Sequence, residues 1–364
     1  MQFLNIANEG VKSLSPYQAG KPIEELEREL GISNIIKLAS NENPFGFPES
    51  AKQAIINQLN DLTRYPDANG FELKAAISKK FGVQANQITL GNGSNDLLEL
   101  FAHTFAGEQD EIIYSQYAFI VYPLVTKAIN AVAREIPAKN WGHDLEAFLA
   151  AINEKTKLIF IANPNNPTGN FLSEAEIDAF LAKVPANVLV VLDEAYTEFT
   201  EVCERVDSFG LLAKYPNLIV SRSLSKAYGL AGLRIGYAVS NAEIADLLNR
   251  VRQPFNCNSL ALVSAIAVMN DDAFVEKVAE NNRREMQRYE AFCQAQGLDY
   301  IPSKGNFITI DFKRPAAPIY EALLREGVIV RPIAGYGMPN HLRISIGLPQ
   351  ENGRLFAALV KVLG

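Results

Sequence analysis

One stretch of small and polar residues combines an amine, two hydroxyls and a guanidinium at close spacing. Lys226 is its only lysine, Ser223 and Ser225 precede it, and Arg234 follows eight residues later. Burial or a neighbouring cation lowers the pKa of a lysine, and the neutral amine then attacks carbonyl carbon. Hydroxyls and a guanidinium suit a phosphate group. The stretch therefore indicates binding of pyridoxal 5′-phosphate through Lys226, although an exposed lysine on a strand-end loop would explain it equally well.

A carboxylate ends the most apolar run of the chain. Asp193 directly follows residues 188–192, so we expect it to be buried and to need a partner. A protonated pyridine nitrogen would serve, and Asp193 would then keep the ring cationic and electron-withdrawing. Tyr196, three residues later, is within reach of the ring hydroxyl. The alternative is that Asp193 caps the start of a helix.

Two further loops follow predicted strands. Residues 91–96 (Gly-Asn-Gly-Ser-Asn-Asp) lead into a helix, and backbone N–H groups at a helix start bind phosphate. They are not a dinucleotide fingerprint, because position 96 is Asp rather than Gly. Residues 163–169 contain two prolines and a glycine, and Asn166 offers an amide there. The competing interpretation is an ordinary strand-to-helix turn for residues 91–96 and a rigid turn for residues 163–169.

The elements that position these residues follow a repeating order. Apolar runs predict seven strands, mostly separated by helical patterns, at residues 88–90, 111–114, 131–135, 157–162, 188–192, 218–221 and 234–240. This order predicts an α/β fold with a mostly parallel sheet covered by helices on both faces. Ligands of such sheets bind outside the carboxyl ends of the strands, which is where the polar loops lie.

The pattern changes after about residue 255. Strands are predicted at residues 306–311, 328–331 and 342–346, with helices at 260–269, 273–296, 317–326 and 350–362. We therefore predict an N-terminal arm (1–30) that packs with the small domain, a large cofactor-binding domain (31–257) and a small α+β domain (258–364).

Composition narrows the class of protein. The 364 residues carry a net charge of −7 without a basic block, which argues against nucleic-acid or anionic-membrane binding. No apolar run approaches the ~20 residues of a membrane span, and the N-terminus does not resemble a signal peptide. Cys203, Cys257 and Cys293 lie far apart, and neither they nor the three histidines form a metal motif. We expect a cytoplasmic protein without a metal ion.

The motifs together resemble a known family over nearly the whole chain. Asn-Pro-Thr-Gly (166–169), Asp193-x-x-Tyr196 and Ser223-x-x-Lys226 with Arg234 stand in the order found in fold-type I pyridoxal-phosphate enzymes, the aspartate aminotransferase superfamily. Within it the chain most resembles the histidinol-phosphate aminotransferases, and the segments that carry this resemblance are residues 15–17, 41–44, 64–67, 225–234 and 330–343. One departure is Tyr114-Ser-Gln-Tyr117, where many members have proline before the ring-stacking aromatic.

The resemblance implies a role for each matching residue. Lys226 would bind the cofactor and shuttle a proton, Asp193 would pair with the ring nitrogen, and Asn166 and Tyr196 would bind the ring oxygen. Tyr117 would stack on the ring. The residues implied near the cofactor phosphate are Gly93, Ser94, Ser223, Ser225 and Arg234, joined by Tyr65 from a second subunit. Those implied to hold substrate are Tyr17, Asn43, Arg331 and Arg343.

The implied reaction is amino transfer from L-histidinol phosphate to 2-oxoglutarate in a homodimer with shared active sites. It yields imidazole acetol phosphate and L-glutamate in histidine biosynthesis. An aromatic-amino-acid aminotransferase and a threonine-phosphate decarboxylase-like enzyme remain close alternatives. Serine acyl enzymes also carry Ser-x-x-Lys, but the accompanying Lys-Thr-Gly is missing and Ser94-Asn-Asp has the wrong order. A non-catalytic regulator of this fold would need an added DNA-binding segment, for which the chain has no room.

Overall fold

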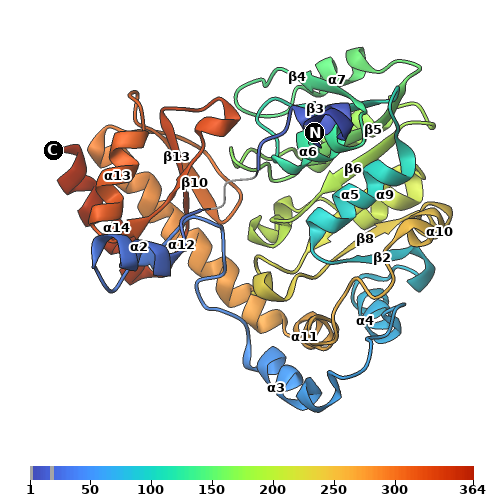
Figure 1. Ribbon diagram of the computed structural model, residues 1–364, viewed down its shortest axis with the longest axis horizontal. Helices are drawn as coiled ribbons and strands as arrows, with labels where there is room; N and C mark the ends of the chain where they lie inside the picture. Colours follow the sequence, from blue (N-terminus) through green and yellow to red (C-terminus); the bar gives the residue numbers. More distant parts are fainter. Residues whose placement is uncertain (1–2, 17–19) are drawn as a thin grey trace.

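Two bodies of secondary structure lie side by side in the computed structural model, which describes residues 3–16 and 20–364 (Figure 1). The larger body is built on a seven-stranded sheet in the order β2-β8-β7-β6-β5-β3-β4. The strands are β2 (Ile88–Gly91), β3 (Glu111–Ser115), β4 (Val132–Ile136), β5 (Thr156–Ala162), β6 (Leu189–Asp193), β7 (Leu218–Ser223) and β8 (Gly236–Ser240). Only β8 runs antiparallel to its neighbours β2 and β7. The predicted α/β fold with seven mostly parallel strands is confirmed.

Alternating side chains of the central strands bury both faces of this sheet. Leu158 and Phe160 of β5 pack with one set of helices, while Ile159 and Ile161 pack with another. The first set comprises α5 (Ser94–Phe105), α6 (Val121–Ala128) and α10 (Ala242–Val251). The second comprises α7 (Leu145–Ala151), α8 (Glu174–Leu181) and α9 (Ser208–Lys214). A strand that is apolar on both faces explains the unbroken apolar runs of the sequence.

The smaller body has an antiparallel sheet in the order β12-β13-β10-β9. Its strands are β9 (Asp299–Ile301), β10 (Phe307–Asp311), β12 (Arg331–Pro332) and β13 (His341–Ser345). They pack with α12 (Asp272–Gln296), α13 (Ala317–Arg325) and α14 (Pro349–Leu363). The predicted strand 328–331 divides: β11 (Val328–Ile329) instead pairs with β1 (Ile36–Lys37) in a separate two-stranded sheet. Strand β9 was not predicted.

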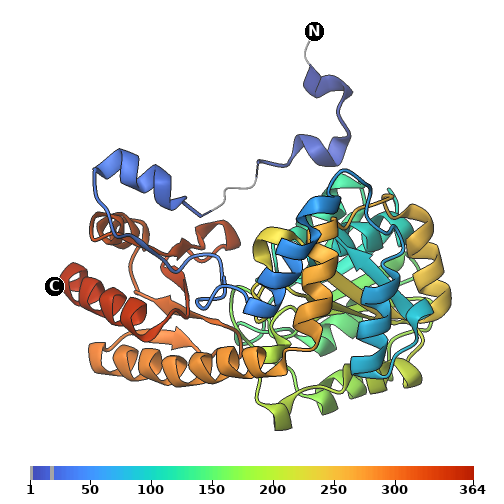
Figure 2. The same cartoon turned by 90° about the horizontal axis from the view of Figure 1, so that it is seen from below.

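Helix α12 joins the two bodies. Its first turns, with Phe274, Val275 and Val278, pack in the core shared by α3 (Glu49–Gln58), α4 (Phe71–Phe81) and α11 (Ser259–Met269). Its later turns, with Met286 and Tyr289, pack in the core of the small sheet. One continuous helix with a face in both cores fixes the two bodies relative to each other (Figure 2). The division of the chain at residue 258 stays a prediction.

The N-terminal segment contacts both bodies. Helix α1 (Glu9–Lys12) lies against α6, where the Gly10 amide donates a hydrogen bond to Asn130 Oδ1. Helix α2 (Ile23–Leu30) packs Leu26 against Leu324 and Ile329 of the small body. Across residues 3–16 and 20–364, no helix has both the length and the apolar character that crossing a membrane requires.

Candidate active site

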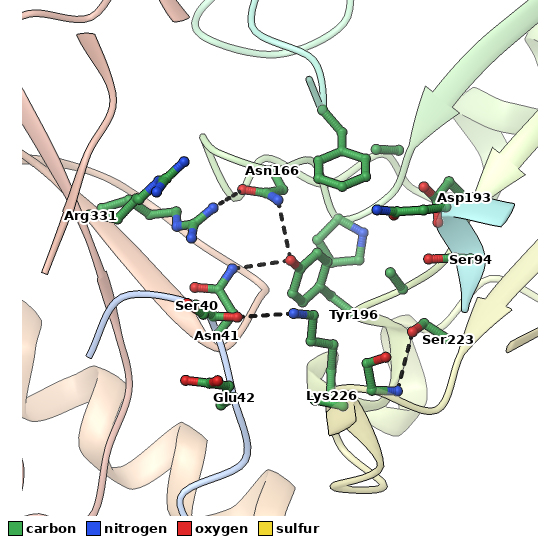
Figure 3. Close-up of a pocket in the computed structure, with 18 of the residues that line it drawn as sticks. Ser40, Asn41, Glu42, Ser94, Asn166, Asp193, Tyr196, Ser223, Lys226 and Arg331 are labelled. Carbon is green, nitrogen blue, oxygen red and sulfur yellow. Dashed lines mark hydrogen bonds between the residues drawn. The ribbon is translucent and has the colours of Figure 1, made fainter. Parts of the chain in front are cut away.

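A cavity of about 260 Å³ lies between the two bodies, at the carboxyl ends of β5, β6 and β7 (Figure 3). The carboxyl ends of parallel strands share one edge of a sheet, so residues distant in sequence converge there. The loop 39–42, the start of α5 and strands β12 and β13 complete the walls. The predicted site residues that line it are Ser94, Asn166, Asp193, Tyr196, Ser223, Ser225, Lys226, Arg234, Arg331 and Arg343.

Lys226 stands in the turn after β7 with its amine inside the cavity (Figure 3). Nζ donates a hydrogen bond to the backbone oxygen of Ser40 at 3.0 Å. Burial lowers the pKa of Lys226 to about 8; the positive charges of Arg343 and Arg234 act in the same direction, and Glu42 opposes them. The amine is therefore partly neutral near physiological pH, which is the state that attacks carbonyl carbon.

Asp193 ends β6 and is almost fully buried. Tyr122 donates a hydrogen bond from its hydroxyl to Asp193 Oδ2 at 2.9 Å. Oδ1 is buried and has no hydrogen-bond partner within the described part of the chain. Burial raises the pKa of Asp193 to about 6, while the Tyr122 hydrogen bond opposes the shift. The carboxylate is thus ionised at neutral pH and presents one oxygen that requires a donor.

Two amides converge on the Tyr196 hydroxyl. Asn41 donates to it at 3.1 Å and Asn166 at 3.3 Å, so this oxygen accepts both hydrogen bonds (Figure 3). Burial nevertheless raises the pKa of Tyr196 to about 12, although the Arg343 charge and the Asn41 hydrogen bond favour the phenolate. The hydroxyl therefore keeps its proton and can donate it in a hydrogen bond to a ligand oxygen.

The groups suited to a phosphate lie together beside Lys226. Arg234, in left-handed backbone conformation (φ 57°), donates from Nη1 to Ser225 Oγ at 3.3 Å. Ser223 Oγ accepts a hydrogen bond from the Ser225 amide at 3.2 Å. Gly93 (φ 84°) precedes the first turn of α5, and a Cβ there would collide with the Arg234 guanidinium. A helix start faced by a cation favours binding of an anion such as phosphate.

Two arginines form the wall contributed by the small body. Arg331 and Arg343 are directly paired across β12 and β13, so their side chains leave the sheet on the same side. Arg343 is buried, and its guanidinium donates to Asn166 Oδ1 at 2.6 Å and to the Ala39 backbone oxygen at 2.8 Å. The pairing places two guanidinium groups at the same cavity as the amine of Lys226.

These residues fit pyridoxal 5′-phosphate. Asp193 Oδ1 requires a donor, which the protonated ring nitrogen supplies; the Tyr196 hydroxyl can donate to the ring oxygen. Ser223, Ser225 and Arg234 suit the phosphate, as argued above. Among the residues that the structure describes, no group of three or more His, Cys, Asp or Glu side chains is placed to hold a metal ion.

The family Aminotransferase class I and II matches residues 33–359 of the chain. Histidinol-phosphate aminotransferase 2 of Haemophilus influenzae is 84% identical over 363 residues, covering 100% of this chain and 99% of that protein. The protein of the same name in Pasteurella multocida is 73% identical over 364 residues, with full coverage of both. The chain belongs to the histidinol-phosphate aminotransferases, within this aminotransferase family.

A solved structure of the same kind of enzyme supports the fold and the cofactor. The histidinol-phosphate aminotransferase of Sinorhizobium meliloti, in complex with pyridoxal 5′-phosphate, superposes with a TM-score of 0.88 at 28% identity. The match covers 98% of this chain and 96% of that one. The present chain is a pyridoxal-phosphate-dependent aminotransferase, and the cavity just described is its candidate active site.

Some predicted residues of the aminotransferase lie outside the lining of this cavity. Tyr117 packs against Trp141 with ring centroids 5.2 Å apart, and Phe119 is the aromatic residue of that loop that lines the cavity. Asn43 donates to the Ala227 backbone oxygen at 2.9 Å and so holds the loop next to Lys226. The stacking role of Tyr117 and the substrate role of Asn43 stay predictions.

Two other predicted residues need separate description. Tyr65 is 82% exposed, stacks on Phe255 at 4.6 Å and lines a second hollow, formed with α4 and α11. Its role toward a second subunit stays a prediction. Tyr17 lies outside the described residues.

The sequence interpretation missed several residues of the site. Tyr122 contacts Asp193 from the first turn of α6, and Asn41 contacts Tyr196 from a loop of residues with polar side chains. Tyr336 lines the cavity from the small body. Asn41 had one detectable signal, because it lies in a stretch of turn-forming residues, and it does adopt a left-handed backbone (φ 55°).

Proposed function

We propose that this aminotransferase transfers the amino group of L-histidinol phosphate to 2-oxoglutarate, which yields imidazole acetol phosphate and L-glutamate. The observation that carries the proposal is the wall of two arginines at the cavity that holds Lys226. The relatives at 84% and 73% identity, which are named for this activity, support the same substrate.

Pyridoxal phosphate, when bound, supplies an aldehyde that accepts the amino group and a cationic ring that withdraws electrons from the substrate Cα. The residues of the chain bind the cofactor and transfer the proton. Asp193 would keep the ring nitrogen protonated by its negative charge. Lys226 would take the Cα proton of the substrate, for which its lowered pKa is suited. Tyr196 and Asn166 would hold the ring oxygen, and Ser223, Ser225 and Arg234 would anchor the phosphate.

The substrate wall must accept two kinds of anion. Histidinol phosphate carries a phosphate and no α-carboxylate, whereas 2-oxoglutarate and glutamate carry two carboxylates. Guanidinium groups bind either anion through paired hydrogen bonds, so Arg331 and Arg343 serve both half-reactions without rearranging the charge of the site. Asn43 and Tyr17, both predicted from the sequence, would complete the substrate contacts.

A panel of amino donors tests the substrate. The purified enzyme is mixed with 2-oxoglutarate and with L-histidinol phosphate, phenylalanine or tyrosine, and glutamate formation is measured. We expect the largest kcat/KM for histidinol phosphate, because only this donor offers a dianion to the arginine wall. A larger kcat/KM for the aromatic amino acids would replace the proposed substrate and leave the cofactor assignment intact.

We further infer a homodimer with shared active sites. Tyr65 and Phe71 present large apolar surfaces to solvent, at 82% and 75% exposure, and both line the second hollow on the α4–α11 face. Burying such a patch against a second copy is favourable. It would also carry Tyr65 toward the partner's cofactor phosphate. A cytoplasmic location is supported by the biosynthetic activity and by three free cysteines.

A further inference from the structure

The only tryptophan of the chain sits on a strained turn beside the active site. Backbone hydrogen bonds between Lys139 and Gly142 close the turn in both directions, at 3.1 and 2.9 Å. Within it Asn140 (φ 50°) and Trp141 (φ 67°) are both left-handed. This conformation is unfavourable for a non-glycine residue, so the surrounding structure must hold it. Two successive left-handed residues form a type I′ turn, where Asn and Gly are favoured, so Asn140 is an ordinary residue at its position and the large Trp141 is an unusual one.

The strained turn aims the Trp141 indole at one ring from each body. The Tyr117 ring, from the large body, lies 5.2 Å away with an interplanar angle of 38°. The His341 imidazole, at the start of β13 in the small body, lies 5.2 Å away at 64°, an edge-to-face contact. Aromatic pairs at these distances attract each other beyond simple burial. Trp141 therefore bridges the two bodies by direct ring contacts.

His341 is held mainly by packing. Its imidazole is 7% exposed, and neither ring nitrogen has a hydrogen-bond partner among the described residues. The carboxylate of Asp311 is 3.9 Å away, and burial lowers the pKa of His341 so that the ring is neutral. The contact with Trp141 is thus a specific restraint on this end of β13.

Both rings that contact Trp141 are connected to Arg343, one of the two arginines that line the cavity. His341 and Arg343 are two residues apart on β13, and alternate residues of a strand share one face, while Leu342 between them enters the small core. On the other side, Asn165 donates to the Tyr117 backbone oxygen at 2.8 Å, and its neighbour Asn166 accepts from Arg343. Trp141 and the pair Asn165–Asn166 therefore connect the Tyr117 loop to β13 by two separate routes.

We propose that Trp141 is a positioning residue, whose indole fixes the β13 strand against the Tyr117 loop and so holds Arg343 in place for the substrate anion. The proposal rests on the substrate role given to Arg343 in the proposed function. Trp141 does not line the cavity and touches no reacting group. Its effect should therefore appear in substrate binding rather than in the chemistry of the amine.

The test compares Trp141→Ala, Trp141→Leu and Trp141→Phe in the holoenzyme. For Trp141→Ala and Trp141→Leu we expect KM for 2-oxoglutarate to rise about five- to tenfold, with kcat within about threefold of wild type. This pattern is expected when a substitution weakens binding of the substrate and of the transition state equally. Trp141→Phe retains an aromatic ring, so its KM for 2-oxoglutarate should stay within about twofold of the wild-type value. Val202→Ala is the matched control, because the Val202 side chain is apolar, 74% exposed and distant from Trp141 in the sequence. Its KM and kcat should equal those of the wild type.

Melting temperature and cofactor content separate positioning from folding. If KM rises only in variants that also lose cofactor or melt early, or if KM stays within twofold in Trp141→Ala, the proposal is overturned. Because 2-oxoglutarate is varied against whichever donor the wild type prefers, a wrong donor in the proposed function leaves this comparison valid.

The single tryptophan also reports on its own contacts. His341→Ala should shift its fluorescence emission to longer wavelength, because water replaces the imidazole beside the indole. The same variant should raise KM for 2-oxoglutarate in parallel with Trp141→Ala. An unchanged emission spectrum would show that the two rings do not meet, and it would remove the basis of the proposal.

Discussion

At the scale of single residues, burial sets the chemistry of the site by moving two pKa values in useful directions. It lowers the pKa of Lys226, which makes the amine available, and raises that of Asp193 without preventing its ionisation at neutral pH. Both effects penalise the charged form. The two groups therefore differ in what each needs from the cofactor: Lys226 needs an electrophile, and Asp193 needs a cation.

The first prediction concerns the amine. In the protein freed of cofactor, the rate at which pyridoxal phosphate becomes covalently bound should rise with pH through about 8, because only the neutral amine reacts. The measurement traps the product with borohydride at successive pH values and quantifies the modified Lys226 peptide by mass spectrometry. Lys226→Ala should give no such product. A midpoint near the ordinary value of 10.5, or an adduct on another lysine, would contradict the assignment.

The second prediction concerns the hydroxyl that supports Asp193. Tyr122→Phe removes the hydrogen bond that lowers the Asp193 pKa, so the carboxyl should protonate at higher pH. Since a neutral carboxyl no longer attracts the ring nitrogen, cofactor affinity of the apoprotein should fall as pH drops, with a midpoint above the wild-type value of about 6. The midpoint is obtained from dissociation constants of pyridoxal phosphate measured between pH 5 and about 8 in both proteins.

Tyr114→Phe is the control for this experiment, because Tyr114 is also buried but makes no hydrogen bond to Asp193. Identical midpoints in wild type and Tyr122→Phe would show that the hydroxyl does not tune the carboxylate.

The residues predicted from the sequence were those at strand ends, and there is a physical reason. Asp193, Asn166 and Lys226 each follow an apolar run, and parallel strands bring such positions together whatever their separation in sequence. Tyr122 and Asn41 could not be found this way. Their roles depend on which helix face or loop meets the cavity, and that is decided by packing between distant segments.

At the scale of elements, the start of α5 shows how backbone geometry and a side chain are matched. Gly93 has φ 84°, and the Arg234 guanidinium occupies the space where a Cβ would lie. The glycine thus allows Arg234, which we predict to bind phosphate, to approach the start of the helix. The sequence predicted this helix start, but it could not reveal that Arg234 fills the gap.

Gly93→Ala should therefore weaken cofactor binding by about tenfold or more, because Arg234 must move away from the helix start. Gly297→Ala is a matched control: it also has positive φ (63°), but nothing lies within 4 Å of the added atom. It should lower stability by about 1 kcal/mol through backbone strain and leave cofactor affinity unchanged. Equal cofactor affinity in both variants would contradict the packing argument.

Short strands mark the limit of prediction at this scale. The run 328–331 reads as one strand, yet β11 and β12 enter different sheets because β1 captures the first two residues. A two-residue strand carries too little pattern to specify its partner. The longer strands of the large sheet are buried on both faces, so their unbroken apolar sequence was sufficient to predict them.

At the scale of the whole molecule, the exposed α4–α11 face is the surface where we expect a second subunit to bind. Tyr65 points outward on this face, stacked on Phe255, and does not line the cavity of its own chain. Closed two-fold symmetry would give each cavity the Tyr65 of the other subunit. Light scattering at working concentration should therefore give the mass of a dimer, and an active monomer would rule out shared sites.

Subunit mixing tests the sharing itself. A Tyr65→Phe chain keeps Lys226, and a Lys226→Ala chain keeps Tyr65, so a mixed dimer contains one site with both residues intact and one with neither. As subunits exchange, activity should rise toward about a quarter of the wild-type value, since half the dimers are mixed and each has one working site.

A second mixture combines wild-type chains with chains that carry both substitutions, and the expected change is opposite. There the intact Lys226 of a mixed dimer meets Phe at position 65, so activity should fall as exchange proceeds. If both mixtures keep a constant activity after exchange is verified by mass spectrometry, Tyr65 acts within its own chain or not at all.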